Sequence, residues 1–177
     1  MKQINKTNNA FLNILKSYSN QIKKLEEIDI FVETGTFFGD SALAFSEYFD
    51  SVFTVELLPS ADKSQRYKEI QQTTTNIKFI FGNSGDVLKD ILSNIENKRC
   101  VFLLDAHNGN SSPLREELNA ILHYSKINDH VIIIDDCSDL GSGNWPTFDE
   151  LKEILSQINS NYKIYETGVG RRVLIIF

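Results

Sequence analysis

The stretch Ile30–Gly39, IFVETGTFFG, decides the fold of this chain. Its apolar start predicts a buried strand, because it is a short run rich in β-branched and aromatic residues that stops at a glycine turn. Gly35 is free to adopt a positive φ, and Gly39 stands just before a helix start at Asp40 or Ser41. The order of strand, glycine loop and helix predicts that backbone amides of this loop face a ligand.

The same alternation of short apolar runs and amphipathic stretches continues along the chain. Segments with helical spacing separate the runs, for example around Leu118 and Leu155. Such alternation predicts right-handed crossovers and a parallel sheet that is covered on both faces. Five buried strands are expected, at Ile30–Val32, Val52–Val55, Ile77–Phe81, Val101–Leu104 and Val131–Ile134.

The end of the chain follows a different pattern. Tyr162–Tyr165 and Arg172–Phe177 are strand-like, and the link Glu166–Gly170 is too short for a crossover helix. We therefore expect an antiparallel hairpin that adds one reversed strand at the edge of the sheet. The predicted fold class is α/β, with a single doubly wound, mostly parallel seven-stranded sheet and a reversed C-terminal hairpin strand.

Residues 1–28 are expected to form a helical segment that packs on the domain formed by residues 29–177. The apolar side chains of this segment recur at alternating steps of four and three, which places them on one stripe of a helix. The stripe fits core packing, and it also fits a contact between two copies in a homodimer. Its members are Phe11, Leu15, Tyr18, Ile22 and Leu25.

Composition and charge exclude several classes of function. The chain has 177 residues, a formal charge of -6 and no Lys/Arg cluster, so we expect no nucleic-acid partner. Its longest apolar runs fall far short of the roughly 20 residues that cross a bilayer, and no apolar signal segment opens the chain, so we expect no membrane partner. Cys100 and Cys137 lie far apart beside apolar runs, which predicts reduced thiols and a cytoplasmic protein.

The loops after the strands are the places to search for chemistry. In an open sheet of this kind, ligands bind beyond the carboxyl ends of the strands, near the point where strand order reverses. Polar and acidic residues are concentrated at those ends. The candidate segments are Glu33–Gly39, Glu56, Gly82–Ser84, Asp105–His107 and Asp135–Asp136.

Glu56 favours a nucleoside ligand. It ends the second strand 21 residues beyond Gly35, where a carboxylate accepts hydrogen bonds from ribose hydroxyls; the alternative is a solvated carboxylate that leads into a turn. Asn83 ends the third strand, where its amide either reads an adenine edge or forms a turn. A Walker loop is excluded because no Gly-Lys-Ser/Thr follows, and Phe37 replaces the second glycine of a dinucleotide loop.

These motifs resemble, in order, the class I S-adenosylmethionine (SAM)-dependent methyltransferases, whose fold is Rossmann-like. FVETGTFFG resembles the first motif, VFTVE the acidic end of the second strand, FIFGNS the adenine-side loop, and the terminal hairpin the reversed seventh strand. The resemblance implies a SAM cofactor. It departs from the usual pattern at Phe37, which replaces a glycine, and at Asn83, which is often aspartate. The implied cofactor-binding residues are Glu33, Gly35, Thr36 and Gly39 near the methionine portion, Glu56 at the ribose, and Asn83 with Ser84 at the adenine.

A narrower resemblance comes from VFLLDAHN, PLREELNAI and VIIIDDC. These segments are similar to sugar O-methyltransferases of the macrocin O-methyltransferase type, some of which use a divalent metal. Asp105, Asp135 and Asp136 fall on adjacent strand ends, where three carboxylates would hold Mg²⁺ or another divalent cation. Asp105 and His107 are the catalytic candidates, with His107 as the base that takes a hydroxyl proton. The alternatives are helix-cap carboxylates and a histidine that bonds backbone.

The expected activity is SAM-dependent O-methylation of a hydroxyl on a sugar or other small molecule, so the partner is a small-molecule or glycan acceptor. Ser138–Trp145 is expected to form a short lid, with Trp145 as an aromatic platform. A SAM-binding module without catalysis, serving a larger assembly, is the second hypothesis. A metal-dependent hydrolase is the third, and Glu56 argues against it.

Overall fold

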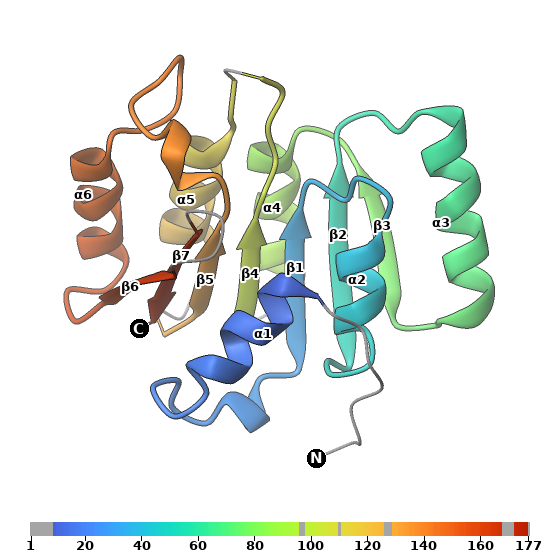
Figure 1. Ribbon diagram of the computed structural model, residues 1–177, viewed down its shortest axis with the longest axis horizontal. Helices are drawn as coiled ribbons and strands as arrows, with labels where there is room; N and C mark the ends of the chain where they lie inside the picture. Colours follow the sequence, from blue (N-terminus) through green and yellow to red (C-terminus); the bar gives the residue numbers. More distant parts are fainter. Residues whose placement is uncertain (1–8, 96–97, 110, 126–128, 168–171, 177) are drawn as a thin grey trace.

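One mixed β-sheet organises the molecule (Figure 1). The structure is a computed structural model, and it describes residues 9–95, 98–109, 111–125, 129–167 and 172–176. The strand order is β3-β2-β1-β4-β5-β7-β6. The strands are β1 Ile30–Thr34, β2 Ser51–Glu56, β3 Ile77–Phe81, β4 Cys100–Leu104, β5 Val131–Ile134, β6 Lys163–Thr167 and β7 Arg172–Ile176.

The first five strands run parallel, which confirms the five strands expected from their apolar runs. All residues of β1, β4 and β5 are buried, as continuous apolar strands in the middle of a covered sheet should be. The chain starts at β1 and moves outward to β2 and β3, then returns to the other side of β1 at β4. The order therefore reverses between β1 and β4, which marks the place where such a fold binds ligands.

Helices cover both faces of the sheet (Figure 1). One face packs against α1, α2 and α3, and the other packs against α4, α5 and α6, so the doubly wound arrangement is confirmed. Alternate residues of β1 serve the two layers, with Phe31 on the first and Val32 on the second. The helices are α1 Ala10–Ser17, α2 Asp40–Phe45, α3 Ala61–Thr73, α4 Ser84–Asn94, α5 Leu114–Tyr124 and α6 Phe148–Ile158.

The C-terminal strands differ in placement from the expected edge position. β7 is antiparallel to both β5 and β6 and lies between them, so the reversed strand is one place in from the edge. The sequences account for this order. The β7 run Val173–Ile176 is uniformly apolar and suits an interior place, whereas Lys163–Thr167 mixes polar and apolar residues and suits the edge.

The N-terminal helix is shorter than its apolar stripe predicted. α1 ends at Ser17, because the hydroxyls of Ser17 and Ser19 bond to carbonyls of the preceding turn and compete with continued helix. Ile22 is nevertheless buried in the same core layer as the α1 side chains. The apolar stripe is thus buried in the chain's own core, which favours the core-packing interpretation. A dimer contact through this segment stays a prediction. In the described part of the chain, no helix has the length and apolar character needed to cross a membrane.

Phe45 tests the layer that α1 and α2 form on the sheet. Its ring is fully buried and stacks on Phe31 with centroids 3.9 Å apart. Phe45→Ala should lower the free energy of unfolding by about 3–5 kcal/mol, because it leaves a cavity in a packed core. Leu58→Ala is the control, since Leu58 is 83% exposed and its loss should change stability by less than about 0.5 kcal/mol. Urea denaturation of the two variants measures both values, and equal effects would contradict this packing.

Candidate functional site

An open cleft of about 1100 Å³ lies at the carboxyl ends of the parallel strands. This volume is slightly above the range of about 300–1,000 Å³ for small-molecule sites. The loops after β1, β2, β3 and β4 all contribute to its walls, as expected for the point where strand order reverses. Its lining includes Gly35, Thr36, Phe37, Glu56, Lys63, Asn83, Ser84, Asp105, His107 and Asn144.

Gly35 is required by the approach of two loops. It has φ 83°, and a Cβ at this position would overlap the carbonyl oxygen of Asp105 in the loop after β4. The amides of Gly35 and Thr36 both donate to the carbonyl of Val55, at 2.9 and 3.2 Å. The expectation that these amides face a ligand is therefore wrong, because the neighbouring strand already takes their hydrogen bonds. Gly35 and Thr36 still line the cleft, through their other atoms.

Phe37 holds the conformation that glycine normally takes at this place in the loop. Its φ is 51°, which is strained for a residue with a side chain. Two hydrogen bonds stabilise it: the Phe37 amide donates to Glu56 Oε2 at 2.9 Å, and the Tyr67 hydroxyl donates to the Phe37 carbonyl at 2.7 Å. The ring is 66% exposed at the cleft, with the Lys63 ammonium 5.1 Å from its centroid. Neither Tyr67 nor Lys63 was singled out by sequence reasoning.

Glu56 is anchored by one oxygen only. Its Oε2 accepts from the Phe37 amide at 2.9 Å and from Lys63 Nζ at 3.3 Å, and the Tyr67 hydroxyl lies 3.4 Å away. In the part of the chain that the structure describes, no group donates to Oε1, and Glu56 lines the cleft. Burial and the charge of Glu56 raise the pKa of Tyr67, so that phenol stays a donor. The carboxylate is thus oriented and has one oxygen left for a ligand.

Glu33 and Gly39 lie beneath the loop and outside the cleft lining. Glu33 is only 2% exposed, and its Oε2 accepts from the Thr54 hydroxyl at 2.7 Å. Burial, opposed in part by the Thr54 bond, raises the pKa of Glu33 to about 8. Gly39 begins α2 with φ 79°, and a Cβ there would come within 2.9 Å of Ile70. Their places indicate support of the loop, and direct contact with a cofactor stays a prediction for both.

Asn83 and Ser84 begin α4 at the other wall of the cleft. Asn83 is the N-cap residue, yet its side chain makes no capping bond and lines the cleft. Ser84 is buried, and its hydroxyl donates to Glu117 on α5 at 2.5 Å. Asn83 is therefore available to a ligand, whereas the hydroxyl of Ser84 is already committed within the protein.

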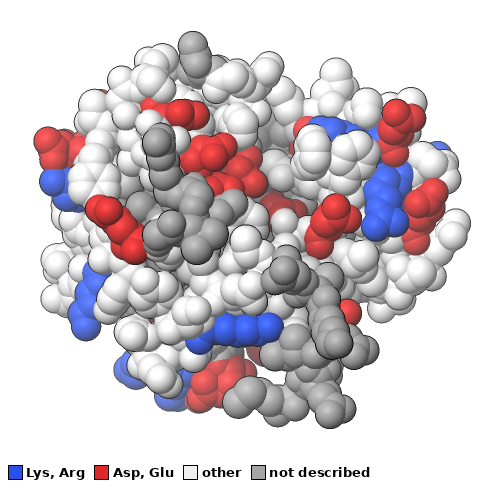
Figure 2. Space-filling view, viewed as in Figure 1, with Lys and Arg blue, Asp and Glu red and all other residues white. Residues whose placement is uncertain are grey.

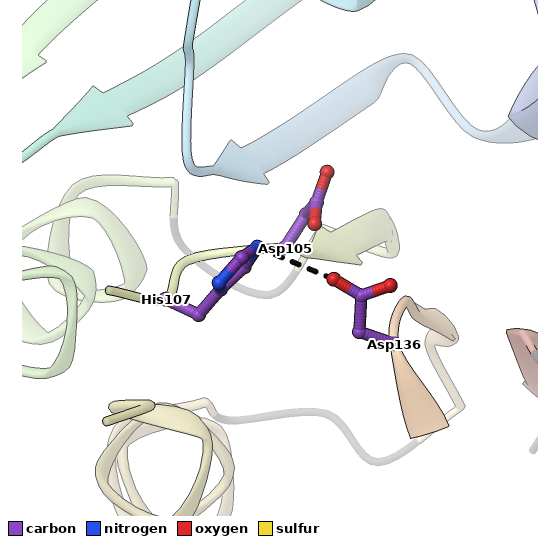
Figure 3. A group of neighbouring side chains, drawn as sticks. All are labelled: Asp105, His107 and Asp136. Carbon is purple, nitrogen blue, oxygen red and sulfur yellow. Dashed lines mark ion pairs between the residues drawn. The ribbon is translucent and has the colours of Figure 1, made fainter. Parts of the chain in front are cut away.

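Asp105, His107 and Asp136 come together at the ends of β4 and β5 (Figure 3). One potential ligand atom from each lies within 4.8 Å of the others, and His107 Nε2 is 3.2 Å from Asp136 Oδ2. Asp136 turns away from β5 with φ 52°. Asp135, expected in this group, is buried and accepts the Asp136 amide at 2.9 Å. The third member of the group is therefore His107 and not Asp135. The left-handed turn at Asp136 directs the Asp136 carboxylate, but not that of Asp135, toward the group.

This group of three can act in two ways. Two carboxylates and an imidazole form a mixed oxygen and nitrogen set that suits a divalent transition metal such as Mn²⁺ better than Mg²⁺, which prefers oxygen ligands alone. Without a metal, the Asp136 carboxylate orients the His107 ring through their 3.2 Å contact, which is the arrangement of a general base. His107 lines the cleft, so either role faces a bound molecule.

The loop before α6 is held down and does not stand free as a lid. Asn144 Oδ1 accepts from the Ser112 amide at 2.8 Å, and Arg115 donates to the Asn144 carbonyl at 2.9 Å. Trp145 is 5% exposed and belongs to the core, so the expected aromatic platform is wrong. Its ring centroid lies 6.1 Å from that of His107, which makes it a packing support for the loop that carries the histidine.

Charge on the visible face is mixed (Figure 2). The blue side chains of the described residues are dispersed among red ones in this view and form no continuous basic surface. Both lysines that line the cleft are paired with carboxylates, Lys63 with Glu56 and Lys89 with Asp86 at 2.8 Å. The absence of a nucleic-acid partner stays a prediction.

The fold is similar to that of many solved structures, and several of these are described as methyltransferases. A Staphylococcus aureus protein described as a caffeoyl-CoA O-methyltransferase has a TM-score of 0.63 and 14% identity, covering 98% of this chain and 86% of that one. An rRNA methylase from Streptococcus thermophilus has a TM-score of 0.56 and 14% identity, covering 96% of each chain. A variant of MtNAS in complex with SAM has a TM-score of 0.54 and 15% identity, covering 94% of this chain and 61% of that one.

These similarities establish the fold alone, because the identities are low. The chain matches no protein-family model and no curated protein sequence. The structural similarities show that the chain has the Rossmann-like fold of the class I methyltransferases, in agreement with the resemblance of its motifs. The narrower likeness to macrocin-type enzymes stays a prediction.

Glu33 generates a prediction about stability and pH. Its folded pKa of about 8 exceeds the ordinary 4.5, so the folded state retains a proton that the unfolded state loses, and stability falls as pH rises between these values. Glu33→Gln removes this titration. Without ligand, the free energy of unfolding of Glu33→Gln minus that of the native protein should rise as pH goes from 5 to 9. The rise should be on the order of a few kcal/mol, measured by denaturation at each pH. Glu153→Gln on the exposed side of α6 is the control, and a pH-independent difference for Glu33→Gln would contradict the buried carboxyl.

Proposed function

We propose that this chain is a SAM-dependent methyltransferase that transfers a methyl group to a hydroxyl of a sugar or other small molecule. The observation that carries the proposal is the Glu56 carboxylate, which accepts hydrogen bonds from described residues through only one of its two oxygens. Its Oε2 is fixed by Phe37 and Lys63, no described group donates to its Oε1, and both Glu56 and the uncommitted side chain of Asn83 line the cleft. A fixed acceptor for ribose hydroxyls and an amide for an adenine edge suit an adenosine ligand.

The acceptor end of the cleft suits methyl transfer to oxygen. With SAM bound, the acceptor hydroxyl oxygen would attack its methyl carbon, the carbon–sulfur bond would break with its electron pair going to sulfur, and S-adenosylhomocysteine would leave. The hydroxyl proton passes to His107, whose ring is oriented by Asp136 at 3.2 Å. Displacement of this kind depends strongly on alignment, and the contact between the Gly35 and Asp105 loops sets the distance between the two ends of the cleft.

A divalent cation fits the same three side chains. Asp105, His107 and Asp136 would hold it, and a bound cation would lower the pKa of the acceptor hydroxyl. His107 is a base only when it is not a metal ligand, so the two roles are alternatives. Chelation distinguishes them.

Glu56 provides the first test of the cofactor. Glu56→Ala removes the acceptor for the ribose hydroxyls and should weaken SAM binding by roughly 30-fold or more, measured by titration calorimetry. Glu56→Gln keeps one acceptor oxygen and should fall between the alanine variant and the native protein. Glu69→Ala, on the exposed side of α3, is the matched control and should bind SAM normally. Unchanged SAM affinity in Glu56→Ala would refute the cofactor assignment.

Asp136 provides the test of the chemistry. Asp136→Asn should leave SAM affinity within about twofold but lower turnover by roughly 100-fold or more, because the support of the base or a metal ligand is lost. The measurement is S-adenosylhomocysteine release with a panel of hydroxylated sugars, with Asp149→Asn as a remote control. Loss of turnover with EDTA and recovery with Mn²⁺ would favour the cation; equal turnover with and without EDTA would favour His107 as the base.

A SAM-binding module without catalysis is the competing proposal. It predicts SAM binding that depends on Glu56 but no S-adenosylhomocysteine release with any acceptor. The close pairing of His107 with Asp136 beside the cleft favours the enzyme, because a module that only binds SAM has no use for an oriented base.

A further inference from the structure

Glu117 is a buried carboxylate that the proposed chemistry does not use. It lies on α5 and is 1% exposed. Its carboxylate accepts from the Ser84 hydroxyl at 2.5 Å, and the Thr34 hydroxyl lies close enough to lower the pKa of this carboxyl. Among the described residues, no lysine, arginine or histidine pairs with it. Burying a carboxylate without a cation costs free energy, so a role for Glu117 is expected to lie in what its two hydroxyl partners hold.

Each hydroxyl partner leads directly to a wall of the cleft. Thr34 Oγ1 accepts from the Asp105 amide at 3.3 Å, and the Thr34 carbonyl accepts from the same amide at 3.2 Å. Ser84 follows Asn83, the N-cap residue of α4 that lines the cleft. Glu117 therefore joins two arms, one to the loop that begins at Asp105 and one to the loop that contains Asn83.

We propose that Glu117 is a positioning residue whose buried carboxylate, acting through Thr34 and Ser84, holds the Asp105 and Asn83 loops in one fixed relation and so strengthens SAM binding. This inference rests on the proposed function for its effect on SAM. The link between the two loops is a property of the protein itself and is present without a ligand.

The charge of Glu117 sets the direction of the hydrogen bonds. An ionised carboxylate only accepts, so the protons of Ser84 and Thr34 both point to it, and a Thr34 lone pair is left for the Asp105 amide. A protonated carboxyl also donates, and a hydroxyl that accepts from it must turn its own proton elsewhere, which weakens the link to Thr34 or Ser84. Burial raises the pKa of Glu117 to about 7, which places the change in the neutral range.

Few other charges act on this group. From α4 and β1 it meets the hydroxyls of Ser84 and Thr34, and from α5 itself the charge of Glu116, which raises its pKa further. Glu33 is next to Thr34 but points to the opposite face of β1, because successive strand residues alternate. A pH effect that disappears in Glu117→Gln is therefore assigned to Glu117.

SAM affinity at two pH values is the first measurement. Glu117→Gln keeps the size of the side chain and removes its charge, so it should weaken SAM binding roughly three- to tenfold at pH 8.5 but less than about twofold at pH 5.5, where native Glu117 is itself neutral. General damage to the fold would weaken binding equally at both values. Glu153→Gln is the control and should match the native protein at both.

Amide exchange in the ligand-free protein is the second measurement. Glu117→Gln should speed exchange at Asp105 and at the first turn of α4 together. Thr34→Val should affect only the Asp105 amide, and Ser84→Ala should affect only the α4 turn, because each removes one arm. These readouts require no SAM, so they test the inference even if the protein binds none and the proposed function fails.

The outcomes separate the two proposals. Normal SAM binding by the native protein, with the same affinity in Glu117→Gln at both pH values or unchanged exchange in both loops, would overturn the positioning role and leave the proposed function intact. Faster exchange in both loops without SAM binding by the native protein would support the link and remove only its consequence for SAM.

Discussion

The close approach of the Gly35 and Asp105 backbones is the constraint on which the site depends. β1 and β4 pair in register up to Thr34 and Leu104, so their loops leave the sheet at the same level. They then cross with no room for a Cβ at Gly35, and the same residue needs a positive φ. The two loops, which on the proposed function would hold the cofactor and the acceptor, therefore contact each other directly.

The parts of the fold that local pattern determines were predictable from the sequence. β1, β4 and β5 are buried on both faces, so each reads as an unbroken apolar run. The length of α1 was not predictable from its stripe, because spacing reports which face is buried and does not report the serine hydroxyls that end the helix. The interior place of β7 depends on pairing between segments far apart in sequence.

The candidate site was predictable in its location but only partly in its contacts. Strand ends placed Asp105, His107 and Asp136 near one another, yet the choice between Asp135 and Asp136 depends on a left-handed turn that no local motif marks. Phe37 looked like a lost glycine, whereas the backbone conformation is kept by bonds to Glu56 and Tyr67. A signal for Glu117 did exist, since it lies three residues after Leu114 and four before Ile121 on the buried stripe of α5.

Two buried carboxylates, Glu33 and Glu117, lie on opposite faces of the sheet around β1, and neither pairs with a cation among the described residues. Ionising them costs free energy in the empty protein, because burial disfavours the charged form. Neither carboxyl lines the cleft, and each instead holds a hydroxyl beside it, Glu33 that of Thr54 and Glu117 that of Ser84. On the proposed function, the protein therefore has lower stability but a fixed arrangement of the loops around the cleft, a common exchange of stability for function.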